Sequence, residues 1–455
     1  MVCFERSEAF KQRSGWMFDY YLRLALRRCR QNLPMVGLLV LTMAIGIASC
    51  MTALTIFQAL SGAPLPGVSP YLHVATMDAR EAVDKDNPDY KRPDSLLKLA
   101  DAKALVDAHR AAQQVAVAQS LAQLGNPDGG KSLQAYGLMA YGPALQTFGV
   151  PLRYGRPWTE AEQSSNAPVM VIDTHVAQKL FGTDDAVGRS VTLGQRSFRV
   201  IGVIAPWAPR MQIFNLGQNA GGVTGQDENF FVPAQASLDA GVGPFTSGEC
   251  GKDAPVISFQ SATVAQCRWM ETWVRLDTRA QADAYDRFLA GYANAQHDAG
   301  RFAYPPHATL YGTQAWMTLN HVVPDDVHLN LILAGGFLLL CLINVAGLLA
   351  ARFLRRQGDV AIRRALGASR RDVFVQHLVE TGLLGLVGGV LALPLTWLGL
   401  WIVRMQPVSY ADAARFSPGV FAMLFALSVA VGLLVGILPA WRVCRQPPAL
   451  QIKIA

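Results

Sequence analysis

Four long apolar blocks constrain this chain more than any other feature of its sequence. They lie at 35–60, 328–351, 377–403 and 418–441, and each is longer than the roughly 20 residues with which a helix crosses the ~30 Å hydrocarbon core of a bilayer. Of all residues 51% are hydrophobic and only 16% are charged, whereas soluble chains carry about 25% charged residues. A buried core helix is the alternative for each block, but core helices rarely run so far with so little charge. We therefore predict a membrane α-helical protein with four transmembrane helices.

The placement of Lys and Arg predicts how these helices are oriented. Residues 1–34 carry seven basic residues against three acids, 352–376 carries seven Arg against two Asp, and 442–455 carries three basic residues and no acid. Because positive charge is retained on the cytoplasmic side, we expect these three segments, and both termini, in the cytoplasm. The short connection 404–417 is then extracytoplasmic. The chain has a net charge of +7, and the positive charge is concentrated in these three segments, where it faces anionic lipid. No basic stripe indicates nucleic acid.

The first apolar block has a second possible interpretation. It follows basic residues, as a signal peptide does, but its apolar stretch is longer than the 7–15 residues usual in such a peptide, so we predict a retained helix. Ahead of it, residues 17–30 have the pattern of an amphipathic helix that lies at the membrane surface. Either Met1 or Met17 could start the chain, because 1–16 has no pattern of its own.

The segment 61–327 is predicted to be a large α+β extracytoplasmic domain in two lobes. Strand patterns occur at 71–76, 133–138, 168–172, 190–193, 197–204 and 273–276, and helical patterns at 95–112, 174–181 and 280–294. Gly182 is expected to end a helix, and Gly194-Gln195 to turn a hairpin. Glycines are dense in 207–265, which we interpret as a looped second lobe or an insertion.

Two of the seven cysteines, Cys250 and Cys267, lie in this outer segment. An oxidising compartment favours one disulfide between them, and two free buried thiols are the alternative. The eight histidines show no ligand spacing, so no metal site is predicted. The sequence contains no nucleophile elbow and no metalloprotease motif that would indicate an enzyme.

One motif points to an ATPase and is rejected. Residues 125–132, Gly-Asn-Pro-Asp-Gly-Gly-Lys-Ser, match the Walker A pattern, and 169–173, ending in Asp173, resembles a Walker B strand. A phosphate-binding loop must follow a strand and open a helix. Here a helical or ambiguous segment precedes the motif and a strand follows it. The predicted topology also places it outside the cytoplasm, and Asn-Pro-Asp-Gly-Gly is ordinary turn chemistry.

The basic segment after the second apolar block is the most informative part of the sequence. It reads as a short helix that breaks at Gly367, followed by Ser369 as the N-cap of the next helix with Asp372 three residues on. Its arginines could receive a cytoplasmic partner, or could simply keep the loop in the cytoplasm, and the residues alone leave both possibilities open. His377 and Glu380 share one face at the start of the third apolar block, where we expect their side chains to extend to the interface.

A resemblance to a known family favours the first of these two roles, in which the basic segment receives a cytoplasmic partner. The run 358–373, Gly-Asp-Val-Ala-Ile-Arg-Arg-Ala-Leu-Gly-Ala-Ser-Arg-Arg-Asp-Val, resembles the signature of MacB/FtsX-type ABC transporter permeases, with Asp359 where Glu is usual. The tail from Leu438-Pro-Ala-Trp-Arg is similar to the end of that family. The outer runs 136–156, 168–182 and 198–203 resemble the MacB-like periplasmic core, whereas 207–265 fits it poorly.

The resemblance implies a permease in the bacterial inner membrane, paired with a second copy or a paralogue, that docks a separate cytoplasmic ATPase. The chain itself is then not an enzyme and binds no cofactor, and ATP and Mg²⁺ belong to the ATPase. The positions expected to dock the ATPase are Arg355, Arg356, Asp359, Arg363, Arg364 and Gly367.

Three functions fit this resemblance. The first is efflux of a peptide, antibiotic or similar compound, with a periplasmic adaptor and an outer-membrane exit protein. The second is extraction of lipoprotein or lipid from the inner membrane, and the third is signalling to a periplasmic partner without transport. The size of the outer segment favours efflux or extraction. A membrane-anchored hydrolase lacks a catalytic constellation, and a stand-alone receptor would not need the basic signature.

Overall fold

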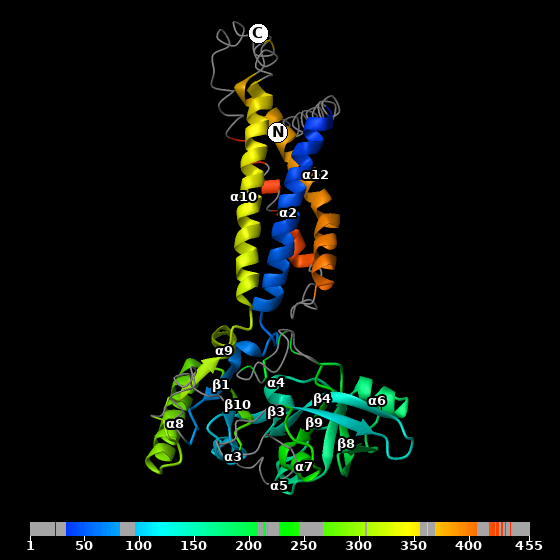
Figure 1. Cartoon of the computed structure of the whole chain (residues 1–455), viewed down its shortest axis with the longest axis vertical. Coiled ribbons are helices and arrows are strands. Elements are labelled where there is room, and N and C mark those ends of the chain that lie inside the picture. The colour runs from blue at the N-terminus through cyan, green and yellow to red at the C-terminus, as the bar shows by residue number, and fades with distance from the viewer. Residues whose placement is uncertain are drawn as a thin grey trace, which may run out of the picture. The chain divides into compact units, whose positions relative to one another are not determined.

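The computed structural model describes residues 23, 33–81, 96–207, 209, 211, 213, 214, 216, 227–245, 267–304, 307–354, 362, 369–406, 418–423, 425, 426, 429, 430, 433 and 437. The chain divides into two compact units, one formed by 1–59 with 324–455 and the other by 60–323. Figure 1 shows long helices in the first unit and a mixed sheet with short helices in the second.

The first unit is built from three long helices in its described part. They are α2 (Leu33–Ser61), α10 (Asp325–Leu354) and α12 (Arg370–Arg404). Three spans within them, Leu33–Ser61, Asp325–Arg352 and Arg371–Arg404, are long and apolar enough to cross a membrane. The described residues of the fourth predicted span, such as 418–423, are helical. A count of four spans stays a prediction.

A shared apolar core holds these helices together. Leu39, Met43 and Ile47 of α2 pack in one buried cluster with Val345 and Leu349 of α10 and Leu384 and Ala392 of α12. Two of the contacts depend on glycine. A Cβ on Gly46 would lie 3.0 Å from Cys341 Cβ, and one on Gly399 would lie 2.7 Å from Thr52 Oγ1. Small residues let membrane helices approach closely, which increases their van der Waals contact.

In the second unit the described strands form one 11-stranded sheet, with the order β11-β1-β10-β3-β4-β9-β6-β8-β5, to which β2 and β7 are added. The strands are β1 (Leu72–Thr76), β2 (Leu96–Leu97), β3 (Gln113–Gly125), β4 (Ser132–Tyr141), β5 (Leu152–Gly155), β6 (Val169–Asp173), β7 (Ser190–Leu193), β8 (Arg196–Ile204), β9 (Phe230–Pro233), β10 (Met270–Arg275) and β11 (Thr309–Gly312). Most pairs are antiparallel, but β9 runs parallel to β4 and β8 runs parallel to β6.

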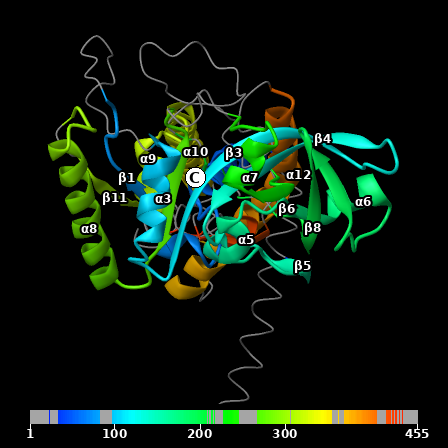
Figure 2. The ribbon, with the colours of Figure 1, turned by 90° about the horizontal axis from the view of Figure 1, so that it is seen from below.

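Helices cover both faces of this sheet. Alternate residues of β3 point to opposite sides, so that Ala116 belongs to one buried cluster and Val117 to the other. The first face is packed by α3 (Leu99–Asp107), α6 (Thr174–Phe181), α7 (Ala234–Asp239) and α8 (Arg279–Asp298). The second is packed by α4 (Ala144–Phe148) and α9 (Thr313–Leu319). Figure 2 shows α3, α7 and α8 along the strands.

Local signals in the sequence set several boundaries as predicted. The helix α6 ends at Phe181, and Gly182 adopts the left-handed conformation (φ 70°) that favours glycine. The strands β7 and β8 pair from Leu193 with Arg196, which leaves Gly194 and Gln195 as the hairpin turn. The helix α8 begins at Arg279, one residue before the predicted start, because Thr278 and Gln281 form a capping box there, and it continues to Asp298.

Two predictions for this unit are wrong. Instead of a helix over 95–112, Leu96 and Leu97 form β2, the helix runs only over Leu99–Asp107, and β3 begins at Gln113. Pairing of Leu97 with Met270 of β10 overrides the local helical pattern. The glycine-rich region 207–265 is not loop throughout. Phe230–Pro233 forms β9 between β4 and β6, and α7 follows it.

Candidate functional site

The ends of α10 and α12 that flank the basic segment are joined by a buried ion pair. Arg352 lies in the last turn of α10, and its Nη2 is 2.8 Å from Oε1 of Glu380 in the third turn of α12. The side chains are 3% and 1% exposed. The interpretation of Glu380 as a residue that extends to the interface is therefore wrong, because its carboxylate is paired inside the helix bundle. The side chain of His377 lies outside the described residues.

Glu380 belongs to a polar face at the start of α12. Gln376, Glu380 and Thr381 are all buried, at a spacing that puts them on the side of the helix that faces its neighbours. Burying charge costs several kcal/mol for each ion, and only a close partner offsets that cost. Ionisable side chains at membrane depth are rare for this reason, and those that persist mark positions with a specific role.

A capping box fixes where α12 begins. The hydroxyl of Ser369 accepts from the Asp372 amide at 3.2 Å, and Asp372 Oδ2 accepts from the Ser369 amide at 3.1 Å and from its hydroxyl at 2.6 Å. The sequence predicted this cap, and the structure confirms it. The segment 355–368 is therefore bounded by Leu354 at one end and by a defined helix start at the other.

The positions predicted to dock an ATPase, Arg355, Arg356, Asp359, Arg363, Arg364 and Gly367, all lie outside the described residues. Their role stays a prediction. Within the segment the structure describes Ile362, which is helical and 59% exposed.

The Walker-like motif is a hairpin loop. Residues 126–131 connect β3 to β4, the Asn126 amide donates to the Lys131 carbonyl at 2.8 Å, and the Asp128 amide donates to Asn126 Oδ1 at 3.0 Å. The segment before the motif is a strand, which corrects the expectation of a helical or ambiguous one. A strand rather than a helix follows, so no helix N-terminus is available to bind phosphate.

Asp173, the Walker B candidate, has a structural role. Its Oδ1 accepts from the Val176 amide at 2.7 Å and so caps α6, and its Oδ2 accepts from Asn229 Nδ2 at 3.0 Å. Burial raises the pKa of this carboxyl, and the two hydrogen bonds oppose that rise. A side chain engaged in this way is not available to coordinate Mg²⁺.

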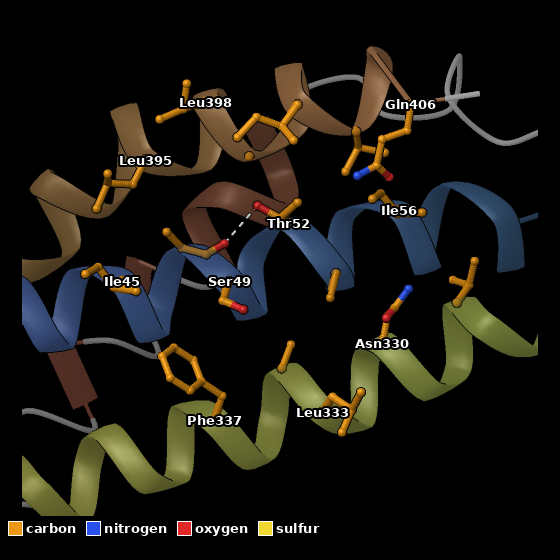
Figure 3. Close-up of a pocket in the computed structure, with 17 residues that line it drawn as sticks. Ile45, Ser49, Thr52, Ile56, Asn330, Leu333, Phe337, Leu395, Leu398 and Gln406 are labelled. Atoms are coloured by element: carbon orange, nitrogen blue, oxygen red, sulfur yellow. Dashed lines mark hydrogen bonds between the residues drawn. The ribbon is translucent and has the colours of Figure 1, made fainter. Parts of the chain in front are cut away.

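A groove of about 590 Å³ lies among α2, α10 and α12. Its wall is mainly apolar, and Figure 3 shows Phe337 and Asn330 of α10 directed toward α2. Ser49 and Thr52 add hydroxyls, but the Thr52 hydroxyl donates to the carbonyl of Ala48 at 2.9 Å. No pattern in the sequence indicated this groove. The helices are apolar on all sides, so their sequences do not show which of their faces stay apart from one another.

Only one of the two cysteines of the predicted disulfide lies among the described residues. Cys267 is disulfide-bonded, whereas Cys250 lies outside the described residues, so the pairing of these two stays a prediction. Among the residues that the structure describes, no group of three or more His, Cys, Asp or Glu could hold a metal ion.

Comparison with known proteins gives matches in both parts of the chain. Residues 36–287 match the MacB-like periplasmic core domain, and residues 331–448 match the FtsX-like permease C-terminal domain. The macrolide export ATP-binding/permease protein MacB of Bdellovibrio bacteriovorus is 23% identical over 66% of this chain and 41% of its own length. The pyoverdine export ATP-binding/permease protein PvdT of Pseudomonas putida is 26% identical over 67% of this chain and 40% of its own length.

The matched region spans about two fifths of the length of these relatives. A solved structure, the periplasmic region of MacB from Actinobacillus actinomycetemcomitans, is 16% identical over 56% of this chain and 94% of that chain. The TM-score of that pair is 0.36, which is too low to support a structural argument.

Proposed function

Because this chain belongs to the MacB/FtsX-type ABC transporter permeases, we propose that it is a membrane subunit that couples ATP hydrolysis by a cytoplasmic ABC ATPase to movement of its outer domain. The residues that would bind ATP are not expected in this chain, and the Walker-like loop is a β-hairpin. The ATPase would dock on the segment 355–367, which faces the cytoplasm in the predicted topology.

The observation that best supports coupling is the ion pair between Arg352 and Glu380. It links the last turn of α10 to the start of α12, on either side of the docking segment. A force applied to that segment by an ATPase would then act on two helices together. Because α10 is a single helix from Asp325 to Leu354, the displacement would be transmitted along its whole length.

We propose export as the task that this coupling serves. The relatives with which the chain aligns are named for export of a macrolide and of pyoverdine, which are chemically different compounds. A second copy or a paralogue, a periplasmic adaptor and an outer-membrane exit protein would complete such a pathway in the bacterial inner membrane.

Extraction of a lipid or lipoprotein is the second candidate, and one observation favours it. The groove among α2, α10 and α12 is mainly apolar and, at about 590 Å³, has the size of a typical ligand pocket. An acyl chain would pack well against this wall, because few of the side chains that line the groove carry hydrogen-bonding groups. Retention of radiolabelled lipid by the purified chain would favour this candidate.

The test of coupling has two stages. First, the tagged chain is purified from native membranes in mild detergent, and the proteins that accompany it are identified by mass spectrometry. We expect an ABC ATPase. Second, stimulation of that ATPase is compared between the chain and its Arg363→Glu/Arg364→Glu variant, which should insert normally but lose stimulation.

A matched control carries the same charge change elsewhere. Arg279 and Arg287 are exposed on α8, so Arg279→Glu/Arg287→Glu should leave ATPase stimulation unchanged. Undiminished stimulation by the Arg363→Glu/Arg364→Glu variant would contradict the docking assignment. Recovery of the chain alone, with or without nucleotide, would contradict the proposed function.

A further inference from the structure

The groove among α2, α10 and α12 has a definite extent along the helices. Its lining runs from Ile45 to Ile56 on α2 and from Leu395 to Gln406 at the end of α12. At about 1.5 Å per residue, each of these stretches is about 16 Å long. Because the hydrocarbon core of a bilayer is about 30 Å thick, the groove covers the depth of one leaflet rather than of the whole membrane.

The connectivity of the chain indicates which leaflet this is. The helix α2 leads into the second unit after Ser61, and α10 begins at Asp325, directly after that unit ends. The lining of the groove on α10 starts at Val327, so it belongs to the part of the helix that is nearest the second unit along the chain. In the predicted topology these parts of the helices lie in the outer leaflet.

The two ends of the groove differ in polarity. Asn330 and Gln406 lie toward the end nearest the second unit, whereas Ile45 and Leu395 lie toward the other end (Figure 3). None of the described residues in the lining carries a charge. An amide side chain both donates and accepts hydrogen bonds, so the polar end can bind ester or phosphate oxygens. A lipid of the outer leaflet has the same order of groups, with its polar atoms outside and its acyl chains below them.

The walls of the groove reach the surface of the helix bundle. Leu333 of α10 is 60% exposed, and Leu398 and Ile402 of α12 are 43% and 47% exposed. A closed cavity would bury side chains of this kind. A lipid could therefore enter the groove sideways from the bilayer, without passing between packed helices.

The sequence of α12 explains why its outer part can stand away from α10. Pro394 has no amide hydrogen and cannot donate to the Val390 carbonyl as a regular helix requires. The Thr396 hydroxyl donates to the Ala392 carbonyl at 2.8 Å, and bonds of this type often bend helices. Both features occur where the lining of α12 begins, at Leu395. They interrupt the regular helix there and allow the rest of α12 to diverge.

Closer packing of α12 against α2 cannot remove the groove. A Cβ on Gly399 would lie 2.7 Å from Thr52 Oγ1, so these two helices already touch along its floor. If a space of about 590 Å³ stayed empty, the side chains around it would lose van der Waals contacts. A molecule from the surroundings is therefore expected to fill it.

We propose that the groove holds one acyl chain of a glycerophospholipid from the outer leaflet, with the ester and phosphate groups of that lipid beside Asn330 and Gln406. The inference deepens the second candidate function, lipid extraction, because it rests on the same groove and names the class of lipid and its orientation. Lipid tails are as apolar as the wall, so the hydrophobic effect does not favour the groove over the bilayer. Contact with the wall and hydrogen bonds to the two amides would retain the lipid instead.

The test measures lipid retention by the full chain in detergent, without ATP or ATPase. The purified chain is stripped of lipid, incubated with palmitoyl-oleoyl phosphatidylethanolamine and studied by native mass spectrometry. We expect one lipid per chain that stays bound at collision energies that remove all others. No such lipid on the parent chain would overturn the proposal. Failure of this measurement would leave the proposed ATPase coupling intact, and loss of coupling would leave lipid retention unchanged.

Two matched substitutions on α10 locate the bound lipid. Leu333 lines the groove, whereas Leu340 is not among the described residues of its lining. The two are 60% and 57% exposed and lie two turns apart on the same side of the helix. Leu333→Trp should fill the groove and lower lipid retention about tenfold, because overfilling a site costs binding energy. Leu340→Trp should leave retention unchanged, and equal retention by the two variants would overturn the proposal.

A third variant tests the orientation of the lipid. Asn330→Leu removes an amide from the polar end and leaves the rest of the groove as it is. It should weaken retention of the phospholipid, because the ester and phosphate oxygens lose a donor. Unchanged retention in this variant would contradict the placement of the polar groups beside Asn330.

Two other occupants would give different results. If an N-palmitoylated peptide displaced the phospholipid at equal concentration, the groove would belong to a lipidated peptide and the phospholipid assignment would be overturned. If the parent chain retained no lipid and formed a dimer that Leu333→Trp dissociated, a second copy of the chain would be the occupant. We expect neither result.

Discussion

Arg352 Nη2 lies 2.8 Å from Glu380 Oε1, and both residues are buried among the helices of the first unit. They are separated by the basic segment that is predicted to face the cytoplasm. Both charges are needed for the helix bundle to be stable, because loss of either partner leaves the other charge unpaired in a low-dielectric environment.

Charge reversal tests this relationship. Arg352→Glu and Glu380→Arg alone should each destabilise the helix bundle by roughly 3–5 kcal/mol and reduce ATPase stimulation, whereas the double variant should recover most of both. The measurements are thermal unfolding in detergent and ATPase rate with the partner. Trp397→Leu, at an exposed position of α12, serves as control. A double variant no better than the single ones would show that the orientation of the pair, rather than its charge complementarity, matters.

The packing of α2 against α10 can be tested by a crosslink. A Cβ on Gly46 would lie 3.0 Å from Cys341 Cβ, and a disulfide needs about 3.5–4.5 Å, so Gly46→Cys requires only a small shift of the helices. We expect mild oxidation to join the introduced thiol to Cys341, detected as a gel shift after cleavage within 61–324. Gly37→Cys, at a position with no neighbour within 4 Å, should not crosslink. Equal yields would contradict the arrangement of these helices.

The assignment of Asp173 as a helix cap predicts a local effect. Asp173→Ala should weaken α6 by about 1–2 kcal/mol, because the Val176 amide loses its acceptor. Hydrogen exchange of residues 174–181 in the full chain should speed up accordingly, while exchange in α8 stays unchanged. Asp128→Ala, in the hairpin loop, is the control. If Asp173→Ala altered nucleotide binding instead, the rejected Walker interpretation would have to be revived.

Glu228 predicts a pH dependence of the second unit (60–323), which is the outer unit in the predicted topology. Burial raises the pKa of this carboxyl to about 8 from its ordinary 4.5, with Asp227 adding to the rise and a hydrogen bond from Gln119 Nε2 at 2.5 Å opposing it. The folded state therefore holds the proton more tightly than the unfolded state. Stability is fully present below about pH 4.5 and declines as pH rises to about 8, by a few kcal/mol in order of magnitude.

Thermal unfolding of the full chain between about pH 5 and 9 measures this dependence. The Glu228→Gln variant cannot ionise at this position, so its outer unit should lose less stability over the same range. Asp277→Asn, at an exposed position, provides the matched control. Identical pH profiles for the parent chain and Glu228→Gln would mean that Glu228 is already ionised in the folded protein.

Features set by neighbours in sequence could be predicted from the sequence alone. The cap joins Ser369 to Asp372, three positions further on, and the turn at Gly194 and Gln195 is closed by the strands on either side. In both cases the interacting groups lie within one turn of backbone, so the residue types determine the geometry.

Features set by distant partners could not be predicted. Leu96 and Leu97 fit a helical pattern locally, but they pair with β10, whose residues lie far along the chain. Glu380 was visible as a charge at the start of an apolar span, yet nothing in its surroundings identifies Arg352 as its partner. The groove among α2, α10 and α12 depends on three helices at once, and no local pattern records how they meet.

The position of β1 has a consequence for biogenesis. This strand follows α2 almost directly. In the predicted topology it would be the first part of the outer unit to cross the membrane, yet Leu72 pairs with Arg275 and His73 with Gly312. Its partners are therefore synthesised and translocated last. Long-range strand pairing is slow to form, so most of the outer unit must emerge before the sheet can close around its first strand. Until then the exposed edges need protection, and a periplasmic chaperone or tight coupling to the translocation machinery is the natural way to provide it.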